Sequence, residues 1–236
     1  ITALLSAAHL SEIDGDKEMA KYCSETADYW NEQIEKWTYV TDTPLSKEVG
    51  VDGYYMRTNN THEPAEDVKN NFIYIKNRNK ENGKMQLWEL ICVDDLALVR
   101  FGLRAADDPK ILNTIKVIDA KLKVDTPNGP CWHRYTNDGY GEDKNGKPFS
   151  GDDHGIGRAW PLLAGERGHY EIAAGNIEEA KKILKSIDKF ANNGLLPEQI
   201  WDTDDIPEKD LFFGQHSGSA MPLVCAHTEY IKLYIG

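Results

Sequence analysis

Hydrophobic residues recur at helical spacing in seven segments of the chain and predict a mostly helical protein. The segments are roughly 1–13, 17–37, 89–105, 109–122, 157–174, 177–192 and 218–234. Apolar positions three and four residues apart are typical of helices with one buried face, and no comparable alternation indicates strands. Two helix starts carry capping signals. Asp108 before Pro109 is typical of a cap followed by a first-turn proline, and Asn176 three residues before Glu179 resembles a capping box.

Short and long connections alternate between the predicted helices. The short ones are DGD at 14–16, ADDP at 106–109 and AGN at 174–176, and the long ones cover about 38–88, 123–156 and 193–217. Antiparallel helices joined in this way form stacked hairpins, with the tight turns at one end and the long loops at the other. Long loops in a compact domain are usually functional, so we expect them to converge on one face. The odd number of helices suggests a piece of something longer.

The composition argues against several classes of protein and ligand. With 40% hydrophobic and 10% aromatic residues the chain is typical of a globular protein, and no apolar run reaches the roughly 18 residues of a membrane span. A formal net charge of -12 argues against nucleic acid and anionic membrane surfaces as partners. The four cysteines, Cys23, Cys92, Cys131 and Cys225, lie far apart and are interpreted as buried apolar residues or as disulfide partners.

The long loops carry aromatic and planar polar residues of the kind that bind sugars. The second loop, GPCWHRYTNDGYGEDKNGKPFSGDDHGIGRAW, is dense in Trp, Tyr, Arg, Asp and Gly. An aromatic ring stacks on the C–H face of a sugar while polar groups bind the hydroxyls around its rim. Arg134 and Asp138 of this loop are candidates for binding a ligand or for structural pairing. Tyr54 and Tyr55 of the first loop are candidates for lining a pocket or for packing against helix ends.

One glutamate stands in an apolar stretch of the third loop. Glu198 follows a proline in GLLPEQIWD, between Leu196 and Trp201, and nothing local neutralises it. Because burying an unpaired charge is costly, this carboxylate must be hydrogen-bonded, paired or used chemically. In GRAWPLLAGERGHYE, the neighbours Glu166 and Arg167 form either an exposed pair or a clamp on substrate hydroxyls.

Other chemical motifs are weak or absent. Seven histidines show neither HExxH nor a zinc spacing, and DGYGEDKNG fails the EF-hand pattern, so we expect no metal. The chain has no GxSxG, no P-loop and no GxGxxG between a strand and a helix, which argues against a nucleophilic serine and nucleotides. A terpenoid cyclase, another helical toroid, is disfavoured because Asp94 and Asp95 lack the third carboxylate of a DDxxD motif.

Five stretches of the chain resemble glycoside hydrolase family 15, the bacterial glucoamylases and related glucodextranases. They are VDDLALVRFGLRAADDP, HRYTNDGYGE, GRAWPLLAGERGHYE, FANNGLLPEQIWD and GSAMPLVCAHTEYIKL. The resemblance implies an all-α fold, the (α/α)6 toroid of twelve helices. Residues 1–236 would form an incomplete catalytic domain with about the sixth to twelfth helices and long loops on one face. It also implies release of glucose from non-reducing ends of starch-like chains or dextrins, with inversion and without a cofactor.

The resemblance assigns expected roles to loop residues. Glu198 matches the general base, which activates water in an inverting glycosidase. Arg134 and Trp160 match residues that hold glucose in the first subsite, by hydrogen bonds and by packing respectively. Asp138 of the same stretch is a further candidate for substrate binding.

The family's general acid is expected outside this chain. It belongs to a WEE-type motif before the helix that here begins ITALLSAAHL, so it would precede residue 1. Glu89 in LWEL imitates that motif but precedes a later helix. Glu166 and Arg167 stand in a motif of the pocket loops, where they either contact sugar or brace the loop. Since acid–base catalysis contributes typically about 10² to 10⁴ in rate, the chain alone should be nearly inactive.

Two hypotheses follow. In the first, the chain is the carboxyl-terminal part of a secreted glucoamylase-like hydrolase of α-glucans or oligosaccharides, and its exposed apolar helix faces need the missing amino-terminal half or self-association. Secretion is inferred from the family's polymeric substrates, and a cytoplasmic location stays open. In the second, the chain is a non-catalytic carbohydrate-binding or inactive remnant. The presence of a WEE motif upstream would discriminate between them.

Overall fold

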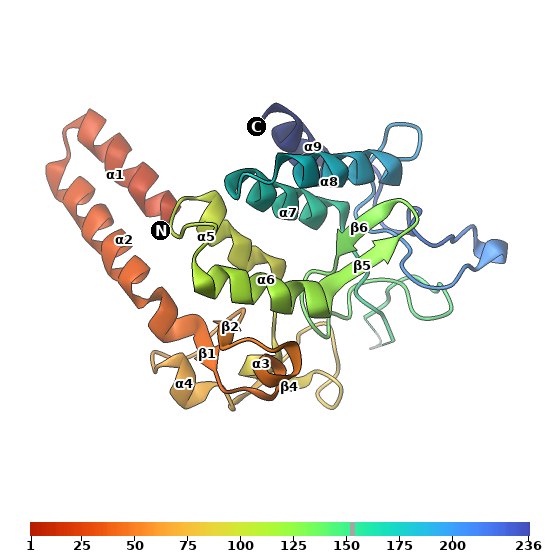
Figure 1. The fold of residues 1–236 in the computed structure, drawn as a ribbon, viewed down its shortest axis with the longest axis horizontal. Coiled ribbons are helices and arrows are strands. Elements are labelled where there is room, and N and C mark those ends of the chain that lie inside the picture. The colour runs from red at the N-terminus through yellow and green to blue at the C-terminus, as the bar shows by residue number, and fades with distance from the viewer. Residues whose placement is uncertain (152–153) are drawn as a thin grey trace.

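Helices α1 and α2 lie at one end of the molecule, α5 to α9 lie in its middle, and loops occupy the opposite end (Figure 1). This computed structural model describes residues 1–151 and 154–236. The long helices are α1 (Thr2–Asp14), α2 (Lys17–Thr38), α6 (Pro109–Leu122), α7 (Pro161–Ala173), α8 (Ile177–Phe190) and α9 (Val224–Ile235). The short helices are α3 (Pro44–Val49), α4 (Ala65–Val68) and α5 (Ala97–Arg100), with 3-10 turns η1 (Leu87–Glu89), η2 (Val93–Leu96) and η3 (Pro207–Lys209).

A helix lies within each of the seven predicted segments. Of the two predicted caps, the one at Asp108 is confirmed and the one at Asn176 is wrong. The Asp108 carboxylate accepts from the Lys110 amide at 2.8 Å with Pro109 at the first position of α6, as predicted. The capping box at Asn176 is wrong, because this residue makes no side-chain cap. Its amide instead donates to the Glu171 carboxylate of α7 at 2.7 Å, so a tertiary contact replaces the local one.

The helix expected over 89–105 is shorter than predicted. Residues 90–92 are extended, and Cys92 pairs with Tyr135 of the second loop while the Ile91 amide donates to the Thr136 hydroxyl at 3.1 Å. The apolar run is therefore a buried extended segment, and the helix begins only with η2. The segments predicted at 157–174 and 218–234 also start late, because the residues before α7 and α9 are not helical.

Three antiparallel hairpins in the loops were not predicted. They pair β1 (Tyr39–Thr41) with β2 (Gly53–Tyr55), β3 (Phe72–Tyr74) with β4 (Lys84–Gln86), and β5 (Lys123–Thr126) with β6 (Gly129–Trp132). Strands of three or four residues are too short to show a clear two-residue period, so the sequence pattern missed them.

The core lies between the helices and the first loop. Tyr54 and Tyr55 are 0% and 1% exposed, so they pack in the core and do not line an open pocket. The Tyr54 hydroxyl donates to the Trp88 carbonyl at 2.7 Å. All four cysteines are free thiols, so the disulfide alternative is wrong, and three are buried as expected while Cys225 is exposed.

The three long loops meet, as the alternating connections predicted. The Asn77 amide of the first loop donates to the Asp138 carboxylate of the second at 2.7 Å. The Gln199 amide of the third loop donates to the Tyr140 carbonyl of the second at 3.0 Å. Two residues of the second loop, Asp152 and Asp153, lie outside the described residues.

Two glycines let α9 approach α7 closely. A Cβ at Gly165 would lie 2.4 Å from Glu229 Cγ, and a Cβ at Gly168 would lie 2.7 Å from Leu233 Cδ2. Gly165→Ala is therefore expected to lower the free energy of unfolding by about 1–3 kcal/mol, because a buried neighbour must move. Urea denaturation measures this. A gain of about 1 kcal/mol, as for Gly→Ala in an open helix, would contradict the tight contact.

Glu229 forms a buried ionic cluster between α5, α7 and α9. Its Oε1 lies 2.7 Å from Arg100 Nη1 and 2.8 Å from His169 Nε2, and the same Arg100 atom lies 2.6 Å from Glu166 Oε2. Burial by itself raises the pKa of Glu229, but the hydrogen bonds and charges of His169 and Arg100 lower it to about 2.

This lowered pKa makes the stability pH-dependent. Because the folded-state pKa lies below that of an unfolded glutamate, Glu229 stabilises the fold above about pH 4.5, and this contribution is lost as the pH falls toward 2. Glu229→Gln is expected to remove on the order of 2–3 kcal/mol of the fall in unfolding free energy across this range. Urea titrations from pH 7 to 2.5 test it, and parallel curves for parent and variant would contradict it.

Large apolar side chains are exposed on three of the long helices. They are Leu5, Leu10 and Ile13 of α1, Met19, Tyr22, Tyr29 and Trp30 of α2, and Val224, Ile231, Tyr234 and Ile235 of α9. Exposed apolar helix faces were expected from the resemblance, and large patches of this kind mark surfaces that pack against other protein. Across residues 1–151 and 154–236, no helix has both the length and the apolar character to span a membrane.

Candidate active site

Residues 196–202 of the third loop bend at Glu198 and are held by hydrogen bonds from two sides. On one side the Ile200 amide donates to the Ala159 carbonyl at 3.0 Å, and on the other the Glu198 amide donates to the Ala220 carbonyl at 2.8 Å. Trp201 is fully buried and anchors the far end of the segment. The backbone of Glu198 is thus fixed between two other parts of the chain.

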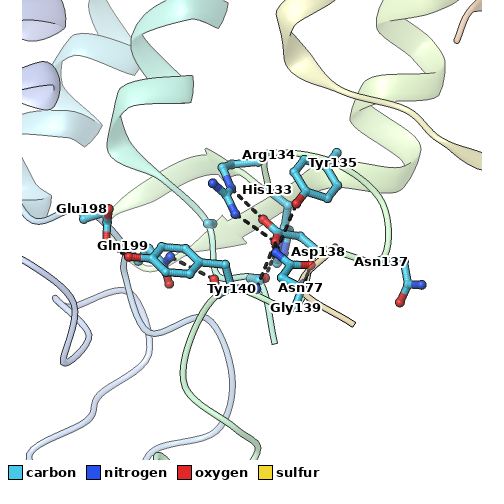
Figure 2. A network of polar contacts seen from close by, with 12 residues as sticks. Asn77, His133, Arg134, Tyr135, Asn137, Asp138, Gly139, Tyr140, Glu198 and Gln199 are labelled. Carbon is cyan, nitrogen blue, oxygen red and sulfur yellow. Dashed lines mark hydrogen bonds and ion pairs between the residues drawn. The ribbon is translucent and has the colours of Figure 1, made fainter. Parts of the chain in front are cut away.

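The carboxylate of Glu198 faces a cavity lined by both polar and apolar side chains. It is half-buried, and within the described residues its side-chain partner is Tyr140, whose hydroxyl donates to Oε2 at 3.2 Å (Figure 2). Burial and the charge of Glu198 raise the pKa of Tyr140, so the phenol stays a neutral donor. The cavity has a volume of about 270 Å³ and is lined by Tyr140, Gly141, Glu142, Pro148, Phe149, Glu198, Gln199, Gly218, Ser219 and Ala220. Most of the hydrogen-bonding capacity of this carboxylate is left for a ligand or water.

Arg134 stands among aromatic rings, one of which belongs to Tyr140, the hydrogen-bond partner of Glu198 (Figure 2). Its guanidinium carbon lies 5.0 Å from the Tyr140 ring centre, 4.9 Å from that of Trp160 and 5.3 Å from that of Tyr135. Burial alone lowers the pKa of Arg134, but hydrogen bonds and the charge of Asp138 raise it above its usual value. A permanently charged, oriented fork of donors therefore lies next to the cavity.

Asp138 holds Arg134 in place. Its two carboxylate oxygens accept from Arg134 Nε at 2.7 Å and Nη2 at 3.0 Å, and Oδ1 also accepts from Asn77 at 2.7 Å and from the Tyr140 amide at 3.0 Å (Figure 2). The side chain is 2% exposed. The structural pairing that the sequence left open is therefore present, and direct sugar contact by Asp138 stays a prediction.

Trp160 lies where the second loop enters α7. It is 7% exposed, its amide donates to the Trp132 carbonyl at 2.9 Å, and its ring lies 6.2 Å from that of Tyr140 at a tilt of 36°. The indole N–H is buried without a hydrogen-bond partner in the described chain. Trp160 thus joins Arg134 and Tyr140 in one aromatic and cationic wall.

Glu166 and Arg167 lie in the body of α7 and contact other helices. Glu166 pairs with Arg100, as described above, and Arg167 pairs with Asp119 of α6 at 3.2 Å and with Glu171 one turn along at 2.7 Å. No contact in the described chain joins either residue to Arg134, Asp138, Trp160 or Glu198. These ion pairs hold α7 against its neighbouring helices. Sugar contact by Glu166 and Arg167 stays a prediction.

A buried ion pair clamps the second loop to the third. Arg158 is fully buried and its Nη1 donates to Asp202 Oδ1 at 2.8 Å, while Nη2 donates to the carbonyls of Glu142 and Asp143 at 2.9 Å. Asp202 Oδ2 also accepts from the Ala159 amide at 3.0 Å. Since Asp202 follows Glu198 by four residues, this clamp sets where the carboxylate stands relative to the second loop.

Sequence reasoning missed several residues of the site. Tyr140, Gln199 and Asn77 were not singled out, although the first two lie inside motifs that were quoted. The signal for Tyr140 was its place in an aromatic-rich loop six residues after Arg134. No sequence signal pointed to Asn77, because its contacts come from a loop about 60 residues away.

Glu89 is engaged elsewhere. Its carboxylate accepts from the Gln86 amide at the start of η1 and lines a different cavity with Trp88 and Lys121. This capping contact agrees with the view that LWEL only imitates the acid motif.

The pair Asp94 and Asp95 borders a larger cavity of about 590 Å³ beyond Tyr135. Burial and the charge of Asp94 raise the pKa of Asp95 well above its usual range. In residues 1–151 and 154–236, no three or more His, Cys, Asp or Glu side chains are grouped to hold a metal ion.

Comparison with models of known protein families shows which family the chain belongs to. Residues 1–234 match the model described as glycosyl hydrolases family 15. The chain belongs to this family. A glucoamylase of Clostridium sp. strain G0005 is 40% identical over 235 residues, which are 99% of this chain and 30% of that protein.

Solved structures place the family 15 chain within a larger fold. A crystal structure of a bacterial glucoamylase complexed with acarbose superposes with a TM-score of 0.82 at 40% identity, over 98% of this chain and 31% of that one. A wild-type glycosidase at 18% identity superposes with a TM-score of 0.59 over 98% of this chain and 48% of that one, and shows the fold alone. The helix-rich fold is thus that of glucoamylases, and the chain spans about 30% of the length of the curated relative.

Proposed function

We propose that this family 15 chain supplies the general base of an inverting hydrolase that releases glucose from the non-reducing ends of α-glucans. The observation that carries the proposal is the carboxylate of Glu198, which stands on a fixed backbone, faces a cavity of about 270 Å³ and, among the residues that the structure describes, accepts a side-chain hydrogen bond from Tyr140 alone. An inverting glycosidase needs such a base, with room for the water that it activates.

Arg134 and Trp160 are proposed to hold the glucose unit next to this base. The guanidinium presents donors for sugar hydroxyls and the aromatic wall provides a surface for the C–H face. Asp138 is proposed to act mainly by orienting Arg134, since both of its oxygens are already engaged. Glu166 and Arg167 are proposed to brace α7 against its neighbours.

The chain is further proposed to be one part of an (α/α)6 toroid. The two glucoamylases that it matches are about three times as long, and large apolar side chains are exposed on α1, α2 and α9, where further helices of the same fold would pack. The general acid is proposed to lie in that further part, about 6.5–9.5 Å from the Glu198 carboxyl group, as inversion requires. We also propose that the protein acts outside the cell, because a polymeric substrate would be met there.

Joining the chain to the missing part tests this function. The part of the Clostridium glucoamylase that precedes the matched region would be fused ahead of Ile1, giving what we call the joined protein. We expect hydrolysis of maltose by the joined protein, β-glucose as its first product by NMR, and little hydrolysis by the chain alone. If α-glucose appears first, inversion is wrong. If both proteins bind glucose without cleaving maltose, the chain is a carbohydrate-binding remnant.

A further inference from the structure

The cavity of Glu198 contains a second carboxylate, which the proposed function does not use. Glu142 is 5% exposed and lines the same cavity. Among the residues that the structure describes, its buried Oε2 has no hydrogen-bond partner. A buried carboxylate oxygen without a donor is costly, so a group that donates hydrogen bonds is needed there.

Neighbouring residues hydrogen-bond the backbone of Glu142 but do not pair with its carboxylate in the described chain. Its carbonyl accepts from Arg158 Nη2 at 2.9 Å and from the Ile156 amide at 3.3 Å, so the guanidinium binds the backbone and not the carboxylate. The other oxygen lies against Gly218, where an added Cβ would be 3.0 Å from Oε1. The backbone of Glu142 is therefore anchored while its carboxylate stays unpaired.

A second acceptor in the same cavity also lacks a donor. Gln199 is 1% exposed and its Nε2 donates to the Tyr140 carbonyl at 3.0 Å, but its Oε1 is buried and unpartnered in the described chain. With Glu198, the cavity presents three side chains that accept hydrogen bonds. Hydroxyl groups match this set, because they bring the missing donors without adding charge.

We propose that Glu142 binds a hydroxyl group in the cavity that it shares with Glu198, either a hydroxyl of the bound glucose unit or the water that Glu198 activates. The proposal rests on the proposed function and adds Glu142 to its site. Both groups offer the same O–H donor. They differ in whether a change of Glu142 weakens substrate binding or slows turnover. A sugar hydroxyl affects binding, and the reacting water affects turnover.

Glu142→Gln in the joined protein tests the proposal, with Glu208→Gln as the control at an exposed position. A hydrogen bond to a charged group corresponds to about a 10- to 100-fold effect, so kcat/KM for maltose should fall by that factor while the control is unchanged. Thermal stability should be kept or raised, because an unpaired buried charge is removed. Glucose affinity of the chain alone, measured by calorimetry with parent and variant, gives a readout independent of turnover.

The outcomes separate the two sources and the two proposals. A higher KM with weaker glucose binding identifies a sugar hydroxyl, and a lower kcat with unchanged glucose binding identifies the water. A variant within twofold of an active parent overturns the role of Glu142 and leaves the proposed function standing. A loss of activity with an equal loss of stability also overturns it, because Glu142 then acts in packing. If the parent joined protein is inactive, the proposed function fails. Weaker glucose binding by the chain with Glu142→Gln than by the parent chain would still support hydroxyl binding by Glu142.

Discussion

Glu198→Gln in the joined protein is expected to lower kcat for maltose by about 10² to 10⁴, the typical contribution of a general base. Glutamine keeps the size of the side chain and an acceptor for the Tyr140 hydroxyl, which lies 3.2 Å from Oε2, but it cannot take a proton from water. Since Arg134 and Trp160 stay in place, glucose affinity should change only a few-fold.

The two quantities are measured by initial rates with maltose and by calorimetry with glucose. Tyr140→Phe is a milder variant for comparison, because it removes the Tyr140 hydrogen bond to Glu198 and keeps the aromatic wall. We expect it to lower kcat less than Glu198→Gln does. Near-normal turnover by Glu198→Gln would remove this residue from the role of base, whatever the behaviour of Tyr140→Phe.

Arg158→Met is expected to lower the free energy of unfolding by about 3–5 kcal/mol, the typical cost of leaving one member of a buried pair alone. Arg158 and Asp202 have side chains 0% and 2% exposed, with Nη1 and Oδ1 2.8 Å apart. The guanidinium also stacks 4.0 Å from the Trp201 ring centre and donates to two carbonyls of the second loop. Methionine fills much of the space but removes the guanidinium as counter-charge of Asp202 and as donor to these carbonyls.

Urea denaturation of the chain at neutral pH measures this loss. Lys182→Met is the matched control, because Lys182 pairs with Glu179 at 2.8 Å on the exposed face of α8 and such pairs contribute less than about 1 kcal/mol. Equal effects of the two substitutions would contradict the view that burial makes the Arg158 pair costly to break. A fall of less than about 1 kcal/mol for Arg158→Met would contradict it as well.

Elements with strong local signals were predictable from the chain. Helix α8 repeats its apolar positions over 14 residues, and α6 starts at a cap and a proline, so backbone and side chains favour the same structure. The run at 90–93 was ambiguous because every residue in it is buried, and periodicity does not separate a buried strand from a buried helix. Its pairing with the second loop decided the outcome.

The family, most of the helices, the convergence of the long loops and the candidate base Glu198 were predictable from the chain alone, because motifs and helical periods are local. The contacts of each loop residue followed from the packing of the folded chain. This packing joined Asp138 to Arg134 and Asn77, set Glu166 and Arg167 in helix-to-helix pairs, and placed Glu142 beside Glu198. Arg134 and Asp138 are only four residues apart, but the other contacts join segments tens of residues apart. They depend on how helices and loops pack, which no local pattern encodes.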